Sequence, residues 1–456
     1  MDKRVQAVIR SVAMEWGDRA AERAARALDA MTDTGRPEEV TQWRVQQFCW
    51  EVLPNATAVS RNDRLLAALA LGALLARFDL QRYAQIAQGQ RTRGLIEGSA
   101  PGPFDRSDWR GLSPRESAIT PPDTDLLTWL KEAGPAEQDG YERAANALEL
   151  ACATGELEPG RPGSGAVRHR VTQAVLETPL PELAGGSPLH WVLTERFHVW
   201  AALGTPRGDL LEPLERDLTS ATSLISSADE TSLVPRQVSW LTDQCLGGVR
   251  LTSAGHLPGR IVRAYLETFG ASELRVGRTP RESNVPSLTF YRAVAERGFL
   301  LVRQGGSLVT SGHAMAAAWG QAAGRRLPTT AELLARGWVG AAGDLRCEVA
   351  ELVCAALLAG PVEADHLAHW IEATSEHRRW IEARGQILPH QTVERLTRST
   401  LASAGRLRLI DRTLHDGLLV LSAPGRTFVL EALRQRLAHG DPAFRMWIDV
   451  PWPETG

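Results

Sequence analysis

Apolar residues recur at helical spacing through the first 100 residues of the chain. Residues 19–31 (RAAERAARALDAM) and 63–78 (DRLLAALALGALLARF) are dominated by Ala, Leu and Arg, which favour helix strongly. The second segment is apolar on nearly every side, so we expect it at the centre of an N-terminal core. Trp43 and Trp50, seven residues apart, are expected to face the same way and to pack there.

Polar and proline-rich residues mark the limits of these helices. Ser60 or Asn62 is expected to cap the helix at 63–78 by accepting a backbone N–H bond that its first turn leaves open. Residues 101–123 break every periodicity with Pro, Gly and Ser, which predicts a long surface connection that is either a domain boundary, the interpretation we favour, or a functional loop. Beyond this connection, further helices are expected at residues 125–132, 141–154, 167–177 and 188–203.

The pattern changes at Leu251. Helices are expected at residues 257–267 and 286–297, the first opened by Pro258, the second capped by Ser283 or Asn284 and ended by Gly298. Two short β-compatible runs follow, at residues 299–303 and 307–310, around the tight-turn sequence Gln304-Gly305-Gly306. Two helices followed by a hairpin are the parts of a winged helix.

A second copy of this order lies near the C-terminus. Residues 393–404 are expected to form a helix ended by Gly405, residues 406–411 and 418–422 two wing strands, and Pro424 the start of another helix. Three intervening helices are expected to hold the two units apart. They are predicted at residues 329–336, 345–359 and 362–381.

The sequence therefore predicts a mainly α protein, with a multi-helix N-terminal half and two winged-helix-like units that contain short β-hairpins. At 456 residues the chain is long enough for several domains. The expected divisions are an N-terminal helical domain (1–100), a second helical region (124–235), a first winged-helix-like unit (236–325), connecting helices (326–384), a second winged-helix-like unit (385–440) and an extended tail (441–456).

The succession LTSAGHLP, RESNVPSL and AVAERGFLLVRQGGSLVTSG, which begins at Leu251, resembles a helical C-terminal module. This module occurs in actinobacterial proteins of the plasmid open-reading-frame-three-like, transposon-passenger group, a family of unknown function. The resemblance covers about residues 236–440. It implies a bacterial source and supports the predicted fold, and it supplies no catalytic residue.

Charge is distributed unevenly along the chain. The formal net charge is −3, and all of the 51 basic residues except Lys3 and Lys131 are arginines, a bias typical of GC-rich genomes. Residues 251–310 nevertheless hold eight arginines against four glutamates, and residues 391–440 hold eight arginines against four acids. The two basic windows coincide with the two winged units, which is the local signal expected of contact with a polyanion.

Arginines in these windows are the candidate contacts for double-stranded DNA or for a partner protein. In a DNA complex the helix before each wing would enter the major groove, and wing arginines would reach phosphates or base edges. The alternative is that they lie on solvated faces in weak ion pairs. The candidates are Arg278, Arg281, Arg292, Arg303, Arg395, Arg398 and Arg412.

Two groups of ionisable residues suggest other chemistry. Asp365, His369, Glu372 and Glu376 share one helix face that could bind a metal, but this face lies opposite an apolar stripe, as on an ordinary solvent-facing helix. His190 and His198 flank Glu195 without the HExxH spacing, among apolar residues typical of a buried helix. The sequence contains no nucleophile, nucleotide-binding or zinc motif, so we expect neither catalysis nor a cofactor or metal.

These observations lead to three interpretations. The first is a non-enzymatic protein that binds a protein partner or acts as a scaffold through its winged-helix-like units. The second is a DNA-binding transcriptional regulator, or a protein of a mobile element or defence system; the third is an enzyme with an unrecognised site. The N-terminus lacks a secretory signal, and the longest apolar run has about 12 residues, fewer than a membrane span needs, so a cytoplasmic location without membrane contact is expected.

Overall fold

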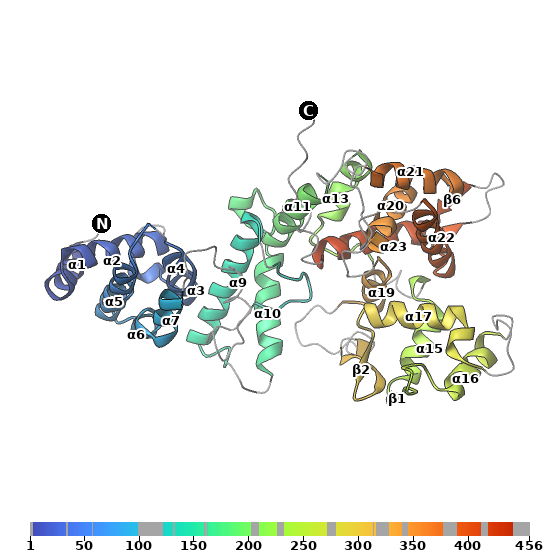
Figure 1. Cartoon of the computed structure of the whole chain (residues 1–456), viewed down its shortest axis with the longest axis horizontal. Helices are drawn as coiled ribbons and strands as arrows, with labels where there is room; N and C mark the ends of the chain where they lie inside the picture. Colours follow the sequence, from blue (N-terminus) through green and yellow to red (C-terminus); the bar gives the residue numbers. More distant parts are fainter. Residues whose placement is uncertain are drawn as a thin grey trace. The chain divides into compact units, whose positions relative to one another are not determined.

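The computed structural model describes most of the chain (Figure 1). The described residues are 3–32, 35–56, 58–98, 122–130, 133–158, 161, 163–201, 209–225, 232–270, 280–312, 314–315, 328–339, 345–376, 390–411 and 418–440. The protein is mainly helical, with two small three-stranded antiparallel sheets in the C-terminal half, so the predicted fold class is confirmed. The chain divides into two compact units, one of Met1–Asp123 with Lys131–Leu176 and one of Thr124–Leu130 with Glu177–Gly456.

The first compact unit is built from helices alone in its described part. They are α1 (Lys3–Trp16), α2 (Asp18–Met31), α3 (Gln42–Gln47), α4 (Leu53–Asn55), α5 (Arg61–Arg77), α6 (Gln81–Gln88), α7 (Gln90–Gly98), α9 (Pro135–Ala153) and α10 (Ser164–Glu177). A short 3-10 turn (Pro37–Glu39) precedes α3, and a π-helical stretch (Phe48–Val52) joins α3 to α4.

Helix α5 lies at the centre of this unit, as its all-round apolar sequence predicts. It packs against α1, α2, α6 and α7, and most of its residues from Ala67 to Leu75 are buried. Trp43 and Trp50 are both buried in the same core, as expected from their spacing. The Ser60 hydroxyl accepts the Asp63 backbone N–H at 3.2 Å, so Ser60 is the N-cap of α5.

The second compact unit is organised around α23 (Ala423–Ala438), which is buried from Phe428 to Ala438. Two buried ion pairs stabilise this helix: Arg434 with Glu431 at 3.0 Å and Arg436 with Glu351 at 2.7 Å. Burial acts to lower the pKa of Arg434, but the carboxylates of Glu431, Glu332 and Glu177 together outweigh it, so that pKa is raised. Shorter elements in this unit are a 3-10 turn (Pro181–Leu183), α11 (Pro188–Ala201), a second 3-10 turn (Glu212–Leu214) and α13 (Glu215–Leu218).

The helix predicted at 125–132 is wrong for its described residues, because Asp125–Leu130 runs without helical structure at the end of α23. The Thr128 backbone N–H donates to the Ala438 carbonyl at 3.0 Å, and Leu127 is buried. The buried Arg196 guanidinium donates to the carbonyls of Thr128 at 2.7 Å and Ala438 at 2.6 Å. The backbone groups that a helix would pair internally therefore pair with α23 and α11 instead.

The first winged-helix unit has the helices and the wing that the sequence predicts. It consists of α15 (Arg236–Gln244), β1 (Val249–Arg250), α16 (Gly259–Phe269), a 3-10 turn (Glu282–Asn284), α17 (Pro286–Arg297), β2 (Leu301–Gln304) and β3 (Ser307–Thr310), with sheet order β1-β3-β2. The two predicted wing strands are present. The predicted cap of α17 by Ser283 or Asn284 is wrong, because Val285 occupies the N-cap position with no side-chain cap bond.

The second winged-helix unit repeats this order ahead of α23. It consists of α20 (Leu345–Ala359), β4 (Val362–Glu363), α21 (Ala364–Glu376), α22 (His390–Arg406), β5 (Ile410–Asp411) and β6 (Leu418–Leu421), with sheet order β4-β6-β5. The unit therefore includes α20, β4 and α21, which the sequence placed among connecting helices at 326–384. The pairing of Val362 with Leu419 attaches β4 to the wing, and a strand of two residues has no periodicity by which to predict it. The predicted tail at 441–456 lies outside the described residues, as does most of the connection at 101–123.

Candidate nucleic-acid interface

The two winged-helix units share one backbone register. The Leu300 N–H donates to the Ala295 carbonyl at 2.9 Å, and the Leu409 N–H donates to the Ala404 carbonyl at 3.0 Å. These bonds close the ends of α17 and α22 in the same way, and they make the two helices equivalent at a shift of 109 residues. The residue before each of these leucines, Phe299 or Arg408, has a left-handed backbone with φ of 58° or 59°.

The strands confirm this correspondence. In the first unit Val249 of β1 pairs with Leu308 of β3, and in the second Val362 of β4 pairs with Leu419 of β6. After the wing, Ser422 caps α23 by accepting the Gly425 N–H. Surface positions of α17 can therefore be compared directly with those of α22.

The outward stripe of the helix before the wing differs between the units. In the first unit, exposed and half-buried residues form a largely apolar stripe of Pro286, Thr289, Phe290, Ala293, Arg297 and Phe299. In the second unit, the equivalent residues are all exposed and are Arg395, Arg398, Ser399, Ala402, Arg406 and Arg408. We call this second set the arginine stripe.

Four arginines of the stripe are therefore presented to solvent. Among the described residues, Arg395 and Arg408 form no ion pair. Arg398 pairs with Glu394 one turn earlier at 2.6 Å, but its side chain is 70% exposed, and such a pair contributes little to stability. Its guanidinium is therefore available to an anionic ligand at small cost.

Arg406 is fixed at the end of the stripe by the first winged-helix unit. The Tyr291 hydroxyl donates to the Arg406 carbonyl at 2.9 Å, and the guanidinium lies 5.5 Å from the centre of the Phe290 ring. Cation–π contact of this kind orients a cation without neutralising it. An open depression of about 590 Å³ lies beside Arg406 and Arg408, lined also by Ala402, Gly405 and Ile410.

Arg292, predicted as a DNA contact, is a buried structural residue. Its guanidinium donates to Glu282 at 2.7 Å, to Glu296 at 2.5 Å and to the Gly255 carbonyl at 2.9 Å. Only 6% of its side chain is exposed, and the equivalent position in the second unit is Leu401. Arg292 therefore ties the loop before α16 to α17, and it presents no charge to a ligand.

The other predicted contacts are placed as follows. Arg303 lies on the wing with its side chain 59% exposed and pairs with Glu296 at 3.1 Å. Arg281 is exposed at the turn before α17. Arg278 and Arg412 lie outside the described residues. The structure brings Arg395 and Arg398 together on α22, and it adds Arg406 and Arg408, which sequence reasoning missed because their alignment with Arg297 and Phe299 depends on the helix-end register.

Helix α19 (Thr330–Val339) covers the C-terminal end of α17. Gly298 and Gly337 meet at this crossing: a Cβ on Gly298 would lie 2.0 Å from the Leu333 carbonyl oxygen, and one on Gly337 would lie 2.2 Å from the Val294 carbonyl oxygen. The Arg336 guanidinium lies 5.2 Å from the centre of the Phe299 ring. The first unit therefore uses the end of its apolar stripe for contacts inside the chain.

The alternative ionisable groups are used for local contacts. His190 Nδ1 is hydrogen bonded to the Thr219 carbonyl at 2.9 Å, and His198 lies 3.5 Å from Glu215. On α21, His369 Nδ1 is hydrogen bonded to the Asp365 carbonyl at 2.9 Å. No group of three His, Cys, Asp or Glu residues in the described part of the chain is arranged to hold a metal ion.

Three of the buried thiols, those of Cys49, Cys245 and Cys354, are protonated near neutral pH. Burial raises the pKa of Cys49 to about 12 and, with smaller opposing effects of Arg292 and Glu296, that of Cys245 to about 11. Burial also raises the pKa of Cys354. A thiolate nucleophile is therefore not available at these three positions.

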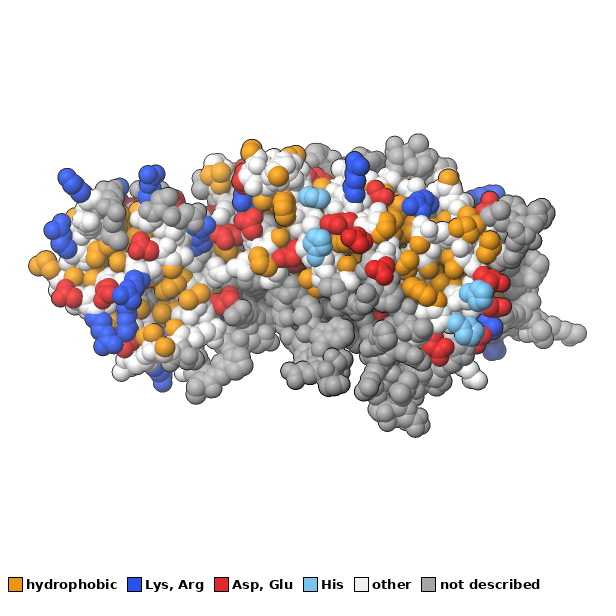
Figure 2. Space-filling model, turned by 90° about the horizontal axis from the view of Figure 1, so that it is seen from above, with side chains coloured by type: hydrophobic (Ala, Val, Ile, Leu, Met, Phe, Trp, Pro, Cys, Tyr) orange, Lys and Arg blue, Asp and Glu red, His pale blue; other side chains and the backbone are white. Residues whose placement is uncertain are grey.

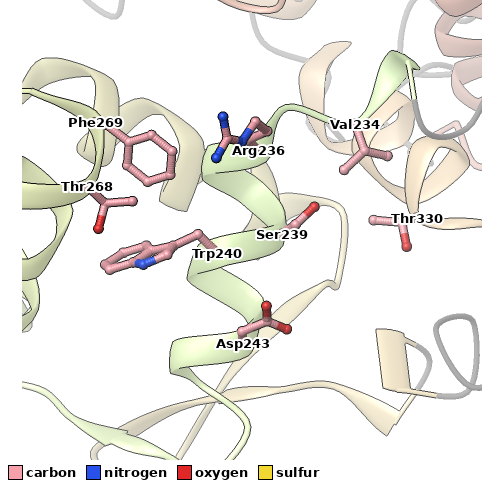
Figure 3. A pocket seen from close by; sticks show the side chains of 8 residues that line it. All are labelled: Val234, Arg236, Ser239, Trp240, Asp243, Thr268, Phe269 and Thr330. Carbon is pink, nitrogen blue, oxygen red and sulfur yellow. The ribbon is translucent and has the colours of Figure 1, made fainter.

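A second depression, of about 510 Å³, lies beside α15 and the end of α16 (Figure 3). Trp240 and Phe269 form an edge-to-face pair at its wall, with ring centres 5.8 Å apart. Arg236 and Asp243 stand on different turns of α15 and do not point toward one another (Figure 3). Arg236 and Asp243, the two ionisable residues that line this depression, are therefore not arranged as an acid–base pair.

On the face drawn in Figure 2, basic, acidic and histidine side chains are scattered among hydrophobic ones. Within the described ranges, none of the helices combines the length and apolar content that crossing a membrane requires. Comparison with protein-family models, curated proteins and solved structures finds no match for this chain.

Proposed function

We propose that this protein is a non-enzymatic, cytoplasmic DNA-binding protein that contacts duplex DNA through the arginine stripe of its second winged-helix unit. The observation that supports this is a difference at equivalent positions: the stripe of the first unit is largely apolar, with Arg297 as its one charged residue, whereas the stripe on and after α22 holds four exposed arginines. In DNA-binding helix-turn-helix folds, the corresponding helix enters the major groove. A transcriptional regulator or a protein of a mobile element would use this activity.

The charge of the stripe favours DNA over a protein partner. Protein interfaces are depleted of charge at their centres, whereas DNA interfaces are strongly basic. The stripe has arginines along its whole length, with only Ser399 and Ala402 between them. A scaffold role, and membership of the transposon-passenger group that the sequence resembles, remain predictions.

Salt-dependent duplex binding tests this function. The full-length chain is titrated into a fluorescent duplex of about 25 base pairs at salt concentrations from 50 to 200 mM. Two to four arginine–phosphate contacts give a slope of log K against log salt of about −1.8 to −3.6, hence a loss of roughly 10- to 100-fold in affinity across this range. Absence of duplex binding at 50 mM salt would contradict the proposal.

A matched pair of variants tests whether duplex binding depends on the arginine stripe or only on the total charge of the protein. R395Q/R398Q/R406Q/R408Q removes the stripe and is expected to abolish measurable binding. R236Q/R250Q/R260Q/R263Q removes four exposed arginines of the first winged-helix unit and is expected to bind like the natural chain. Equal loss of affinity in both variants would show that binding depends on overall charge and would exclude the stripe as the site.

A further inference from the structure

The arginine stripe divides into two parts along α22. Arg395 and Arg398 lie in the first half of the helix, whereas Arg406 is its last residue and Arg408 follows it. At 1.5 Å per residue, Arg395 and Arg406 are about 16 Å apart along the axis. The major groove is about 12 Å wide and 8.5 Å deep, so a helix that crosses the groove cannot bring both ends of the stripe to base edges together.

Small side chains let the first half of α22 approach a groove closely. Ser399 and Ala402 are the exposed residues beside and after Arg398 on the stripe. In the first unit the position of Ser399 is taken by Phe290, whose ring would hold the helix backbone away from base edges. The second unit therefore combines a slim helix face with two long cationic side chains.

The second half of the stripe is held in place by the fold. Arg406 has its carbonyl bonded to Tyr291 and its guanidinium over Phe290, and Arg408 has a left-handed backbone that turns the chain into β5. Cations fixed at the end of a helix, beside an open depression, suit a DNA phosphate rather than a base edge.

We infer, building on the proposed function, that Arg395 and Arg398 read guanines on neighbouring base pairs in the major groove, and that Arg406 and Arg408 hold the flanking phosphates. Arginine binds guanine through two parallel hydrogen bonds to O6 and N7, the most common specific contact in the major groove. The two arginines are one helical turn apart, about 4.5 Å along the axis, close to the 3.4 Å rise between base pairs. The preferred ligand is therefore duplex DNA with adjacent G·C pairs.

The first step of the test is selection. The full-length chain is incubated with a library of randomised duplexes, and the bound fraction is sequenced. We expect enriched duplexes to share guanines at two neighbouring positions. Replacing either guanine by adenine in the best duplex is expected to weaken binding roughly 5- to 100-fold.

The second step assigns each arginine. R395A and R398A should each remove the guanine preference at one position, so that the guanine and adenine duplexes bind equally there. R408A, the matched control on the same stripe, should weaken binding to both duplexes by the same factor and reduce the salt slope by about one. R406A should behave like R408A.

The outcomes separate this inference from the proposed function. Duplex binding without a guanine preference, or a guanine preference that stays unchanged at both positions in R395A and in R398A, would overturn the inference and leave DNA binding intact. Tighter binding to single-stranded DNA or to duplex RNA than to the selected duplex would also overturn it. Absence of all nucleic-acid binding at 50 mM salt would overturn both.

Discussion

Gly298 and Gly337 lie against each other where α17 crosses α19, so closely that a Cβ on Gly337 would be 2.5 Å from the Gly298 nitrogen. Neither glycine has a left-handed backbone. Their role is therefore steric: the absence of side chains lets the two helices touch through their backbones. Since α19 also packs along α23, this crossing joins the first winged-helix unit to the buried central helix.

We expect Gly337→Ala to destabilise the protein by about 1–3 kcal/mol, because the added methyl group must push two backbones apart. Urea unfolding followed by circular dichroism measures this. Gly259→Ala is the control: its Cβ would meet its nearest neighbour, the Pro280 carbonyl oxygen, at an ordinary 3.6 Å. Equal stability of the two variants would show that the crossing tolerates separation.

The buried pair of Arg292 and Glu282 gives a second prediction. Arg292→Met leaves the Glu282 carboxylate, 3% exposed, without its cation, and is expected to cost about 3–5 kcal/mol of unfolding free energy. The double variant E282Q/R292M has no unpaired buried carboxylate at this position, so we expect it to recover much of the lost unfolding free energy. Arg303→Met, which removes the exposed partner of Glu296, should cost less than about 1 kcal/mol.

A result in which R292M and R303M destabilise equally would contradict the structural role of Arg292. If R292M remained as stable as the natural chain but lost duplex binding, the residue would be a ligand contact after all. The double variant shows why R292M is destabilised. If the cause is the unpaired Glu282 carboxylate, replacing Glu282 by glutamine restores much of the unfolding free energy; if the cause is lost packing around Arg292, it does not.

Sequence patterns predicted the elements whose signals are local. The wing strands follow from the Gly305-Gly306 turn between β-compatible runs, and α20 was predicted with its observed bounds. By contrast, β1 and β4 have two residues each and exist only through pairing with β3 and β6. A segment so short offers no pattern, and its structure is set by a partner about 60 residues away.

The residues of the candidate site could likewise be predicted only in part from the sequence. Arg395 and Arg398 could be chosen because they lie in the basic window 391–440, but the same criterion also selected Arg292 from the window 251–310. Arg292 is buried because it pairs with Glu282, which lies ten residues earlier in the chain, before α17 begins. No helical spacing relates these two residues, so the sequence pattern does not reveal the pair. Arg408 was missed because Gly405 was taken as the helix end, whereas the left-handed residue is Arg408 itself.

His439 makes stability depend on pH. Burial and the nearby guanidinium groups of Arg336, Arg196 and Arg434 hold its pKa well below 6.5. The folded chain therefore keeps a neutral ring where the unfolded chain takes up a proton. Stability is full above about pH 6.5 and falls as the pH drops below that value, by up to about 1.4 kcal/mol per pH unit until the lowered pKa is reached.

Urea midpoints measured from pH 7.5 to 5 test this dependence. His439→Gln should flatten the profile below pH 6.5, because glutamine takes up no proton in either state. His366→Gln is the control, since His366 has a side chain 82% exposed. If both variants kept the slope of the natural chain, another group would have to be responsible for the acid sensitivity.

Arg408 combines a strained backbone with a position on the arginine stripe, so its replacement should separate stability from binding. A left-handed backbone at a non-glycine residue lowers the unfolding free energy by roughly 1–2 kcal/mol. Glycine adopts this backbone without strain, but it increases the entropy of the unfolded chain, so only part of this free energy is regained. We expect Arg408→Gly to raise the unfolding free energy by about 0.5–1 kcal/mol while it weakens duplex binding. Arg395→Gly removes the same charge from inside α22 and should lower stability by about 1 kcal/mol. Opposite shifts in the urea midpoint, with weaker binding in both variants, are the expected result; a lower midpoint for both would show that the left-handed turn at Arg408 is unstrained.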